Sequence, residues 1–285
     1  MLTALDITPA VVREAVENDC QLIVSHHPVI FQPIKSLAAD DVPALLMKNG
    51  ISAICMHTNL DAAPGGVNDT LCEILGIAAE GRESFAEGCG RIGTTMPTTV
   101  EALAKFCADT LHTGVKYVNG AREVTCLAEV SGGGGSYLQE AIDRGADCLV
   151  TGEAAHHIAL LAKQKGIGLV VAGHWGTEHA IADVLAALIA RQFPGLTVAH
   201  AEADTDPYCY LADKRIFTFI KEETSMSLDA ATLALVAGEL KNTLLDAKID
   251  KIFEPTRDEV LITLRTRTET HRLLLSARSG SAASV

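Results

Sequence analysis

Residues 21–31 read QLIVSHHPVIF, in which two adjacent histidines directly follow a short apolar run. The same order returns in ISAICMHTNLD at residues 51–61 and in IGLVVAGHWGTEH at residues 167–179. Apolar runs of this length, separated by segments with helical periodicity such as TPAVVREAVEND at residues 8–19, are typical of parallel strands joined by helices. The sequence therefore predicts βαβ units and a parallel sheet.

Residues 81–95, GRESFAEGCGRIGTT, are rich in glycine and interrupt this alternation, so we expect a loop or crossover here. A second series of helices and strands follows and runs from about residue 100 to the segment LTVAHAE at residues 196–202. The sequence thus predicts an α/β fold made of two α/β halves. Because the histidine and carboxylate groups come from both halves, we expect a metal site in the cleft between them.

Histidine and carboxylate side chains lie where the predicted strands end. In open α/β sheets, binding sites form at the carboxyl ends of the strands. Imidazole and carboxylate groups suit zinc, iron or manganese, and five of them are more than one tetrahedral ion requires. We therefore predict a centre of two divalent metal ions held by five residues: His26, His27, Asp61, His174 and Glu178.

The roles of several of these residues have alternatives. His26 and His27 could bind one ion together only if the chain turns at Pro28, because neighbours on an extended strand point to opposite faces. If the chain stays extended, the two histidines would bind different ions. Asp61 is expected to bridge the ions, although an aspartate there could instead cap the next helix. His57 is our candidate catalytic residue, for proton transfer, and a structural histidine is the alternative.

His174 and Glu178 are four residues apart, which on a helix places both side chains on one face. The alternative is a helix that begins near Thr177 and whose Glu178 only offsets the helix dipole. Three residues of TGEAAHH also follow a strand but rank behind the five ligands, because two ions need no more: Glu153, His156 and His157. The run SGGGGS at residues 131–136 fits a tight turn better than an anion site, since it lacks the lysine of a phosphate-binding loop.

The composition limits the classes of function. The formal charge of −13 argues against a general nucleic-acid surface, which needs clustered lysine and arginine. No apolar stretch approaches the ~20 residues of a membrane span, and the N-terminus lacks the features of a secretory signal, so we expect no membrane partner and a cytoplasmic location. The eight cysteines show no CxxC spacing, which favours reduced thiols over disulfides or thiolate ligands.

The motifs quoted above, together with GCGRIG, GGGGSYLQEAIDRGADCLVTGEAAHH and DPYCY, resemble the Nif-three-like dinuclear metal-centre family, whose bacterial members are labelled GTP cyclohydrolase I type 2 homologues. The resemblance covers roughly the first three-quarters of the chain. It implies the same five ligands, two α/β halves, a homo-hexameric ring with its sites facing an inner cavity, and a hydrolase-like centre. Members usually begin with a further helix and an Asp-Asn-x-Gly-Leu segment, so we expect the first strand here to be short and to lack a neighbour.

The C-terminal segment differs from the rest in charge. Residues 226–285 hold equal numbers of acidic and basic residues, so the whole imbalance lies before Met226. The segment resembles the opening of the NFACT N-terminal domain, through one helix and two or three strands. We therefore expect a metal domain at residues 1–211, a linker at 212–225 and a partial NFACT-like segment after it. The codons for Lys-Glu-Glu at residues 221–223 could have the sequence of a ribosome-binding site just upstream of a start codon at Met226. This favours read-through of two adjacent genes, and a true fusion is the alternative.

The sequence thus predicts a divalent-metal-binding protein that acts as a dinuclear metal-dependent hydrolase. Two ions would activate a water near Asp61 for attack on a small-molecule substrate, and the family label implies a purine nucleotide. The alternative is a non-catalytic hexameric scaffold that binds metal or a partner. Ribosome or tRNA engagement through the C-terminal segment is disfavoured, because the NFACT-like part is incomplete and its charge is balanced.

Overall fold

The computed structural model describes four stretches of the chain: residues 1–210, 248–256, 259–265 and 270–276. The chain divides into two compact units, Met1–Ala212 and Asp213–Val285. The larger unit contains two sheets, each with helices on both faces. The expected α/β fold in two halves is therefore confirmed for this unit.

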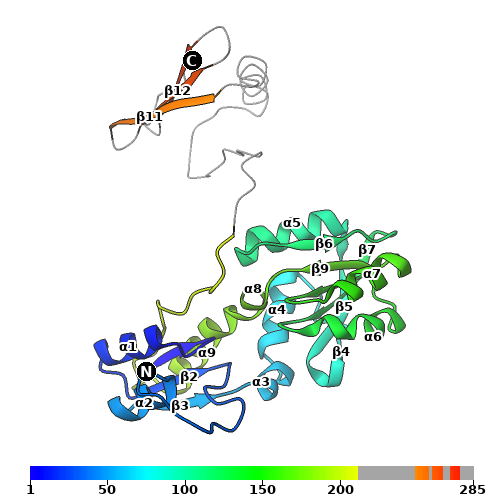
Figure 1. Ribbon diagram of the computed structural model, residues 1–285. Coiled ribbons are helices and arrows are strands. Elements are labelled where there is room, and N and C mark those ends of the chain that lie inside the picture. Colours follow the sequence, from blue (N-terminus) through cyan, green and yellow to red (C-terminus); the bar gives the residue numbers. More distant parts are fainter. Residues whose placement is uncertain (211–247, 257–258, 266–269, 277–285) are drawn as a thin grey trace. The chain divides into compact units, whose positions relative to one another are not determined.

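The first sheet of the larger unit is parallel throughout (Figure 1). Its strands, in spatial order, are β10 (Ala199–His200), β1 (Leu2–Ala4), β2 (Leu22–Ser25) and β3 (Ser52–Cys55). β1 is short, as expected, but β10 and β2 pair with it on either side. The expectation that β1 lacks a neighbour is therefore wrong, because the chain returns after its last long helix to supply β10.

Helices cover both faces of this sheet. Three of them pack on it: α1 (Pro9–Glu17) and α2 (Val42–Asn49) on one face, and α9 (Ala180–Gln192) on the other. Successive side chains of β2 point to opposite faces of the sheet: Ile23 packs in the cluster with Val11 of α1, and Val24 packs in the cluster with Ile181 of α9. Burial of both faces explains why β1 and β2 read as continuous apolar runs, whereas β3 is largely exposed.

The second sheet is mixed. Its six strands follow the order β4 (Glu83–Phe85), β5 (Gly90–Thr98), β7 (Val124–Val130), β8 (Cys148–Thr151), β9 (Gly168–Val171) and β6 (Lys116–Val118). The strands β7, β8 and β9 are parallel neighbours, whereas β4, β5 and β6 pair antiparallel. The parallel core of this sheet is the part that ends next to the predicted metal ligands.

The glycine-rich residues 81–95 form strands, so the expected loop is wrong. They supply β4, the short 3-10 helix η1 (Ala86–Gly88) and the first half of β5. A Cβ on Gly90 would lie only 2.7 Å from the Phe85 ring and 2.8 Å from a Val130 methyl. Gly90 is needed because neighbouring side chains approach the strand closely, and not because the chain turns at this position.

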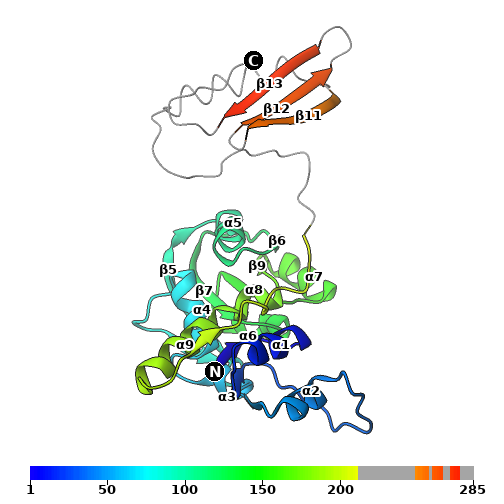
Figure 2. The same cartoon turned by 90° about the vertical axis from the view of Figure 1, so that its left-hand side faces the viewer.

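Helices also cover both faces of the second sheet (Figure 2). They are α4 (Val67–Leu75) and α5 (Val100–Leu111) on one face, and α6 (Leu138–Asp143) and α7 (His156–Lys165) on the other. α4 belongs to both halves, because Val67 packs in the cluster with Ile181 of the first half and Leu71 in the cluster with Val150 of the second. This shared helix joins the two halves beside the predicted site.

The cysteines take no part in cross-linking. All eight are free thiols, as their spacing indicated, and Cys72, Cys107 and Cys148 are buried. Burial raises the pKa of these three thiols, so they stay protonated and act as small apolar core groups. Within the described residues, no helix has both the length and the apolar character that crossing a membrane requires.

The smaller unit contains an antiparallel sheet of three strands. They are β11 (Lys248–Thr256), β12 (Glu259–Arg265) and β13 (Thr270–Ser276), in that order. The helix expected after Met226 and the linker expected at residues 212–225 lie outside the described residues.

Candidate metal centre

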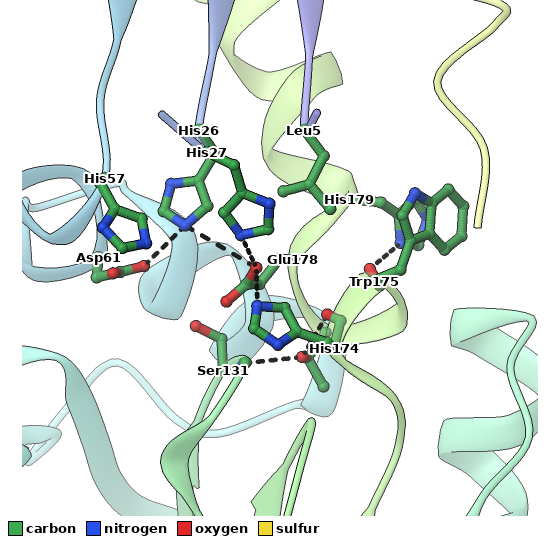
Figure 3. Close-up of polar contacts among 12 residues, drawn as sticks. Leu5, His26, His27, His57, Asp61, Ser131, His174, Trp175, Glu178 and His179 are labelled. Carbon is green, nitrogen blue, oxygen red and sulfur yellow. Dashed lines mark hydrogen bonds and ion pairs between the residues drawn. The ribbon is translucent and has the colours of Figure 1, made fainter. Parts of the chain in front are cut away.

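The structure brings together six residues that the sequence singled out: His26, His27, His57, Asp61, His174 and Glu178 (Figure 3). The first two follow β2 directly, and their backbone N–H groups extend the pairing with the end of β1. His57 and Asp61 come from α3 (Thr58–Ala62) and its N-terminal end, after β3. His174 and Glu178 are the two ends of α8 (His174–Glu178), after β9. The centre is therefore built from strand ends of both halves.

The Glu178 carboxylate occupies the middle of the centre. Its Oε2 atom lies 3.0 Å from Nε2 of His27 and 3.1 Å from Nε2 of His174. The same oxygen lies 3.9 Å from Nε2 of His26. Asp61, in contrast, reaches only this last histidine, with its Oδ1 3.5 Å from Nε2. Glu178, rather than Asp61, is thus the carboxylate that the histidines share.

Three groups of side chains present atoms that could hold a metal ion, with all ligand atoms of a group within 4.8 Å of one another. They are His27 with His174 and Glu178, His26 with Asp61 and Glu178, and His26 with His27 and His57. The first two groups have only Glu178 in common. His26 and His27 thus belong to different groups in the first two cases and to one group, with His57, in the third.

Each of three histidines is oriented by an oxygen atom behind it. Nδ1 of His26 lies 2.9 Å from the Met56 carbonyl oxygen, and Nδ1 of His27 lies 2.9 Å from Oδ1 of Asp6. Nδ1 of His174 lies 3.1 Å from Oε1 of Glu153. When Nδ1–H donates to these oxygens, the lone pair of each Nε2 is directed toward the centre, which is the arrangement of metal-bound histidines.

Buried polar atoms without a partner converge at the same place. Nε2 of His26, Oδ1 of Asp61 and Oε2 of Glu178 are fully buried and make no hydrogen bond. Such atoms cost free energy unless something satisfies them, on the order of 1–3 kcal/mol for each neutral group and more for charged ones. One or two cations between them would satisfy all three, so the donor set fits a metal.

The electrostatics of the centre follow from burial and from Glu178. Burial lowers the pKa of His26 to about 4 and, together with the Glu178 charge, raises the pKa of Asp61 to about 6. Burial alone would raise the pKa of Glu178, but the imidazoles of His174 and His27 beside its carboxylate lower it. The pKa of His174 is raised in return. Glu178 is therefore ionised at neutral pH, and protons on its histidine partners would compete with metal ions.

Backbone geometry at α8 explains why the centre forms here. Gly173 has φ +78°, which lets the chain turn from β9 directly into the helix. The helix therefore begins at His174, earlier than the expected start near Thr177. Thr177 Oγ1 accepts a hydrogen bond from the Gly132 N–H, at 3.0 Å, and so ties α8 to the glycine-rich turn after β7.

The remaining candidate residues divide into two sets. Glu153, which the sequence ranked behind the ligands, orients His174, whereas His156 and His157 are exposed on the first turn of α7 and join none of the three groups. His57 lies at the rim, with its ring centroid 5.3 Å from that of His26. The sequence did not lead us to predict a role for Asp6, which orients His27. A signal was present, because this acidic residue directly follows the apolar run LTAL, as the predicted ligands follow theirs.

Comparisons with known proteins give a family and relatives for the larger unit. The family described as Duf34/NIF3 (NGG1p interacting factor 3) matches residues 1–207, and the NFACT N-terminal and middle domains match residues 229–283.

A Clostridium acetobutylicum protein named GTP cyclohydrolase 1 type 2 homolog is 30% identical over 191 residues, which cover 62% of this chain and 71% of that protein. A Streptococcus pneumoniae protein of the same name is 31% identical over 229 residues, covering 74% and 86%. The crystal structure of a hypothetical Staphylococcus aureus protein is 28% identical, with a TM-score of 0.68, and covers 74% of this chain and 86% of that one.

Proposed function

This chain belongs to the Duf34/NIF3 family, and on that premise we propose that its centre holds two divalent metal ions and serves in the hydrolysis of a small molecule. The observation that carries the proposal is the convergence of three buried, unpartnered ligand atoms from His26, Asp61 and Glu178. A purely structural cluster would have paired these atoms with protein groups.

Each ion would have its own set of ligands. His26 and Asp61 would hold one ion, His27 and His174 the other, and Glu178 would bind both. Nitrogen and oxygen donors of this kind suit zinc, iron or manganese. The exposed positions around His174 leave room for a substrate, because this residue is about one-third exposed whereas Glu178 is buried.

The protein residues would supply orientation and proton transfer. Divalent ions, when bound, lower the pKa of water and polarise a substrate oxygen, which is the chemistry that hydrolysis needs. Asp6 and Glu153 hold the rings of His27 and His174 in place. His57 is the candidate proton shuttle: burial and neighbouring histidines lower its pKa, and its Nδ1 lies 3.5 Å from Thr58 Oγ1. A neutral imidazole with a free nitrogen can accept a proton from water or substrate.

The proposed substrate is a small molecule, and a purine nucleotide is the specific candidate. The relatives from Clostridium acetobutylicum and Streptococcus pneumoniae are named as homologues of a GTP cyclohydrolase, which supports this class. The chain's charge of −13 is unfavourable for long nucleic acids, whose phosphates need clustered cations.

Elemental analysis of purified variants tests the proposal. We expect two ions per chain in the unaltered protein, loss of both in Glu178→Gln, and loss of one in Asp61→Asn, because only Glu178 is shared. His57→Gln should keep both ions and lose most hydrolytic turnover in a screen of nucleotides. His156→Gln, which alters an exposed histidine outside the centre, is the control. One ion or fewer in the unaltered protein would show that the two-metal proposal is wrong.

A scaffold function is the second candidate, and the loop between β2 and α2 favours it. This loop exposes four large apolar side chains: Ile30 at 52%, Phe31 at 70%, Ile34 at 53% and Leu37 at 46%. Exposed apolar patches of this kind mark contacts with other chains, and a hexameric ring would cover them. We expect light scattering to give a hexamer for the unaltered protein and a smaller assembly for Phe31→Ser. Full biological activity in Glu178→Gln would favour the scaffold over the hydrolase.

A further inference from the structure

A pocket of about 420 Å³ adjoins the metal centre. It shares two residues with the centre, His174 and Glu153, and lies between the ends of β8 and β9, the start of β6 and the segment after β10. Its size falls within the range of pockets that hold small ligands, about 300–1,000 Å³. Whatever binds here would lie next to one of the proposed metal ligands.

Trp175 forms a fixed aromatic wall of this pocket. It stacks on His179, with ring centroids 3.9 Å apart and planes within 4° of parallel (Figure 3). Nδ1 of His179 lies 3.2 Å from the Trp175 carbonyl oxygen, which fixes the pair further. Another part of Trp175 packs against the apolar cluster that contains Leu5 and Ile181, and the remainder lines the pocket. A second planar ring could stack there.

Two tyrosines complete the aromatic lining. The Tyr210 hydroxyl accepts a hydrogen bond from Thr113 Oγ1, at 3.0 Å, and donates one to Asp206 Oδ2, at 2.9 Å. Its ring lies so close to the backbone that a Cβ on Gly114 would be 2.4 Å from it. Tyr208 lines the pocket as well but is 71% exposed. Tyr210 is thus ordered by its contacts, whereas Tyr208 offers its ring to solvent or to a ligand.

We propose that this aromatic pocket, bounded by Trp175, Tyr208 and Tyr210, binds a planar heteroaromatic ring of nucleobase size by stacking. The charged residues of the lining are one lysine, Lys116, and two acids, Glu153 and Asp206. Lys116 suits an anionic group such as a phosphate on the same ligand, and the carboxylates suit N–H groups of the ring. The ligand class is therefore a mononucleotide or a similar anionic heterocycle. This inference rests on the proposed function, because it names the molecule that the neighbouring centre would act on.

The tryptophan itself reports on the proposal. Trp175 is the only tryptophan among the 285 residues, so all tryptophan fluorescence comes from the pocket wall. GMP and guanosine, titrated into the full-length protein with its metal, should quench this fluorescence to a saturating limit. Ribose 5-phosphate, which has the phosphate but no aromatic ring, should not. Equal quenching by ribose 5-phosphate would show an anion site and overturn the stacking proposal.

Variants separate stacking from other effects. Tyr208→Ser keeps the fluorophore and should weaken GMP binding roughly tenfold or more, as expected for loss of one base-to-aromatic contact. Trp175→Leu should weaken binding similarly, measured by equilibrium dialysis. Tyr117→Ser is the matched control, because Tyr117 of β6 is an exposed tyrosine too, at 43%, but does not line the pocket. Unchanged affinity in both pocket variants would overturn the proposal.

Metal content, measured in the same samples, keeps this inference distinct from the proposed function. Absence of metal in the unaltered protein, with quenching intact, would contradict the metal-dependent hydrolase and leave the aromatic pocket standing. Two ions per chain without any quenching would support the metal centre and contradict the aromatic pocket. A fluorescence change that follows protein concentration alone would mean that a second copy of the chain covers Trp175, and this too would overturn the ligand proposal.

Discussion

Gly132 packs directly against the metal centre, although it has no side chain to contribute. A Cβ there would lie 2.2 Å from Oε1 of Glu178 and 3.0 Å from Nε2 of His174. The residue also has φ +54°, a conformation that other L residues rarely adopt. The run SGGGGS is therefore a close-packed support of the centre as well as a turn.

We expect Gly132→Ala to reduce metal content and to destabilise the fold, because the methyl group must displace Glu178. The backbone conformation alone should cost about 1 kcal/mol or more. Gly133→Ala is the matched control in the same turn, since a Cβ there meets nothing within 4 Å and no positive φ is involved. Elemental analysis with urea unfolding tests both. Normal metal content in Gly132→Ala would show that Glu178 has more freedom than the geometry indicates.

Glu129 is a second unusual residue, outside the centre. It is fully buried in β7, where Cys72 Sγ lies 3.5 Å from its Oε1 and its Oε2 has no partner. Burial raises the pKa of Glu129 well above its ordinary value, although the nearby Arg91 opposes this. The folded protein therefore holds a proton on Glu129 that the unfolded chain releases above about pH 4.5.

Because the pKa of Glu129 is higher in the folded protein than in the unfolded chain, the free energy of unfolding falls as pH rises above 4.5 toward the pKa of the folded state. Glu129→Gln removes this titration and keeps the shape. The variant should gain stability relative to the unaltered protein between pH 5 and pH 8, by up to about 1.4 kcal/mol per pH unit. Urea unfolding at both pH values measures the difference. A difference that does not change with pH would mean that Glu129 is ionised in the fold.

Asp204 connects the segment after β10 to the end of β1. Its carboxylate accepts hydrogen bonds from the backbone N–H groups of Leu5 and Asp6, and it lies 3.1 Å from Nε2 of His200. The side chain is almost fully buried. Because the Asp6 side chain orients His27, this contact between the ends of neighbouring strands also supports the candidate metal centre.

Asp204→Ala should therefore affect both stability and metal binding. The buried N–H group of Leu5 and the partly buried one of Asp6 lose their acceptor, which we expect to cost about 1–3 kcal/mol of unfolding free energy. Metal content should also fall, since the Asp6 backbone is no longer held. Glu202→Ala, an exposed neighbour, is the control. If Asp204→Ala destabilised the fold but kept full metal content, Asp204 would be a structural residue only.

Periodicity predicted most elements, because apolar runs and helical spacing report burial directly. QLIV and ISAIC became β2 and β3, and TPAVVREAVEND became α1. The prediction of a loop at residues 81–95 was wrong, because the sequence does not say whether a glycine forms a turn or, like Gly90, leaves space for neighbouring side chains. Pairing between β1 and β10 is also invisible locally, since these strands are almost two hundred residues apart.

The candidate ligands were predictable because they follow apolar runs in pairs with metal-type spacing. What the sequence could not give is how they divide between ions. Glu178, and not Asp61, lies close to three of the histidines, because the turn at Gly173 lets α8 begin at His174. Nor could spacing show that Asp6 orients His27, because that contact joins two different strand ends.

The two halves of the larger unit meet at the metal centre, so metal binding and folding should be coupled. His26 and His27 belong to the first sheet, whereas His174 and Glu178 follow β9 of the second. An ion that binds only the folded arrangement stabilises it in proportion to the logarithm of ion concentration over the dissociation constant. Without metal, the cluster keeps buried atoms unsatisfied and the halves lose this link.

The C-terminal unit should add nothing to the centre. All proposed ligands, and the Asp6, Met56 and Glu153 groups that orient them, lie within residues 6–178. Among the described residues, the three-stranded sheet of the smaller unit ends at β11 on one side and at β13 on the other, and such edges favour association between chains. Deletion of residues 226–285 should therefore keep the metal content unchanged and reduce aggregation, as measured by elemental analysis and light scattering. A truncated chain that lost its metal or failed to fold would show that the C-terminal segment is an integral part of the protein.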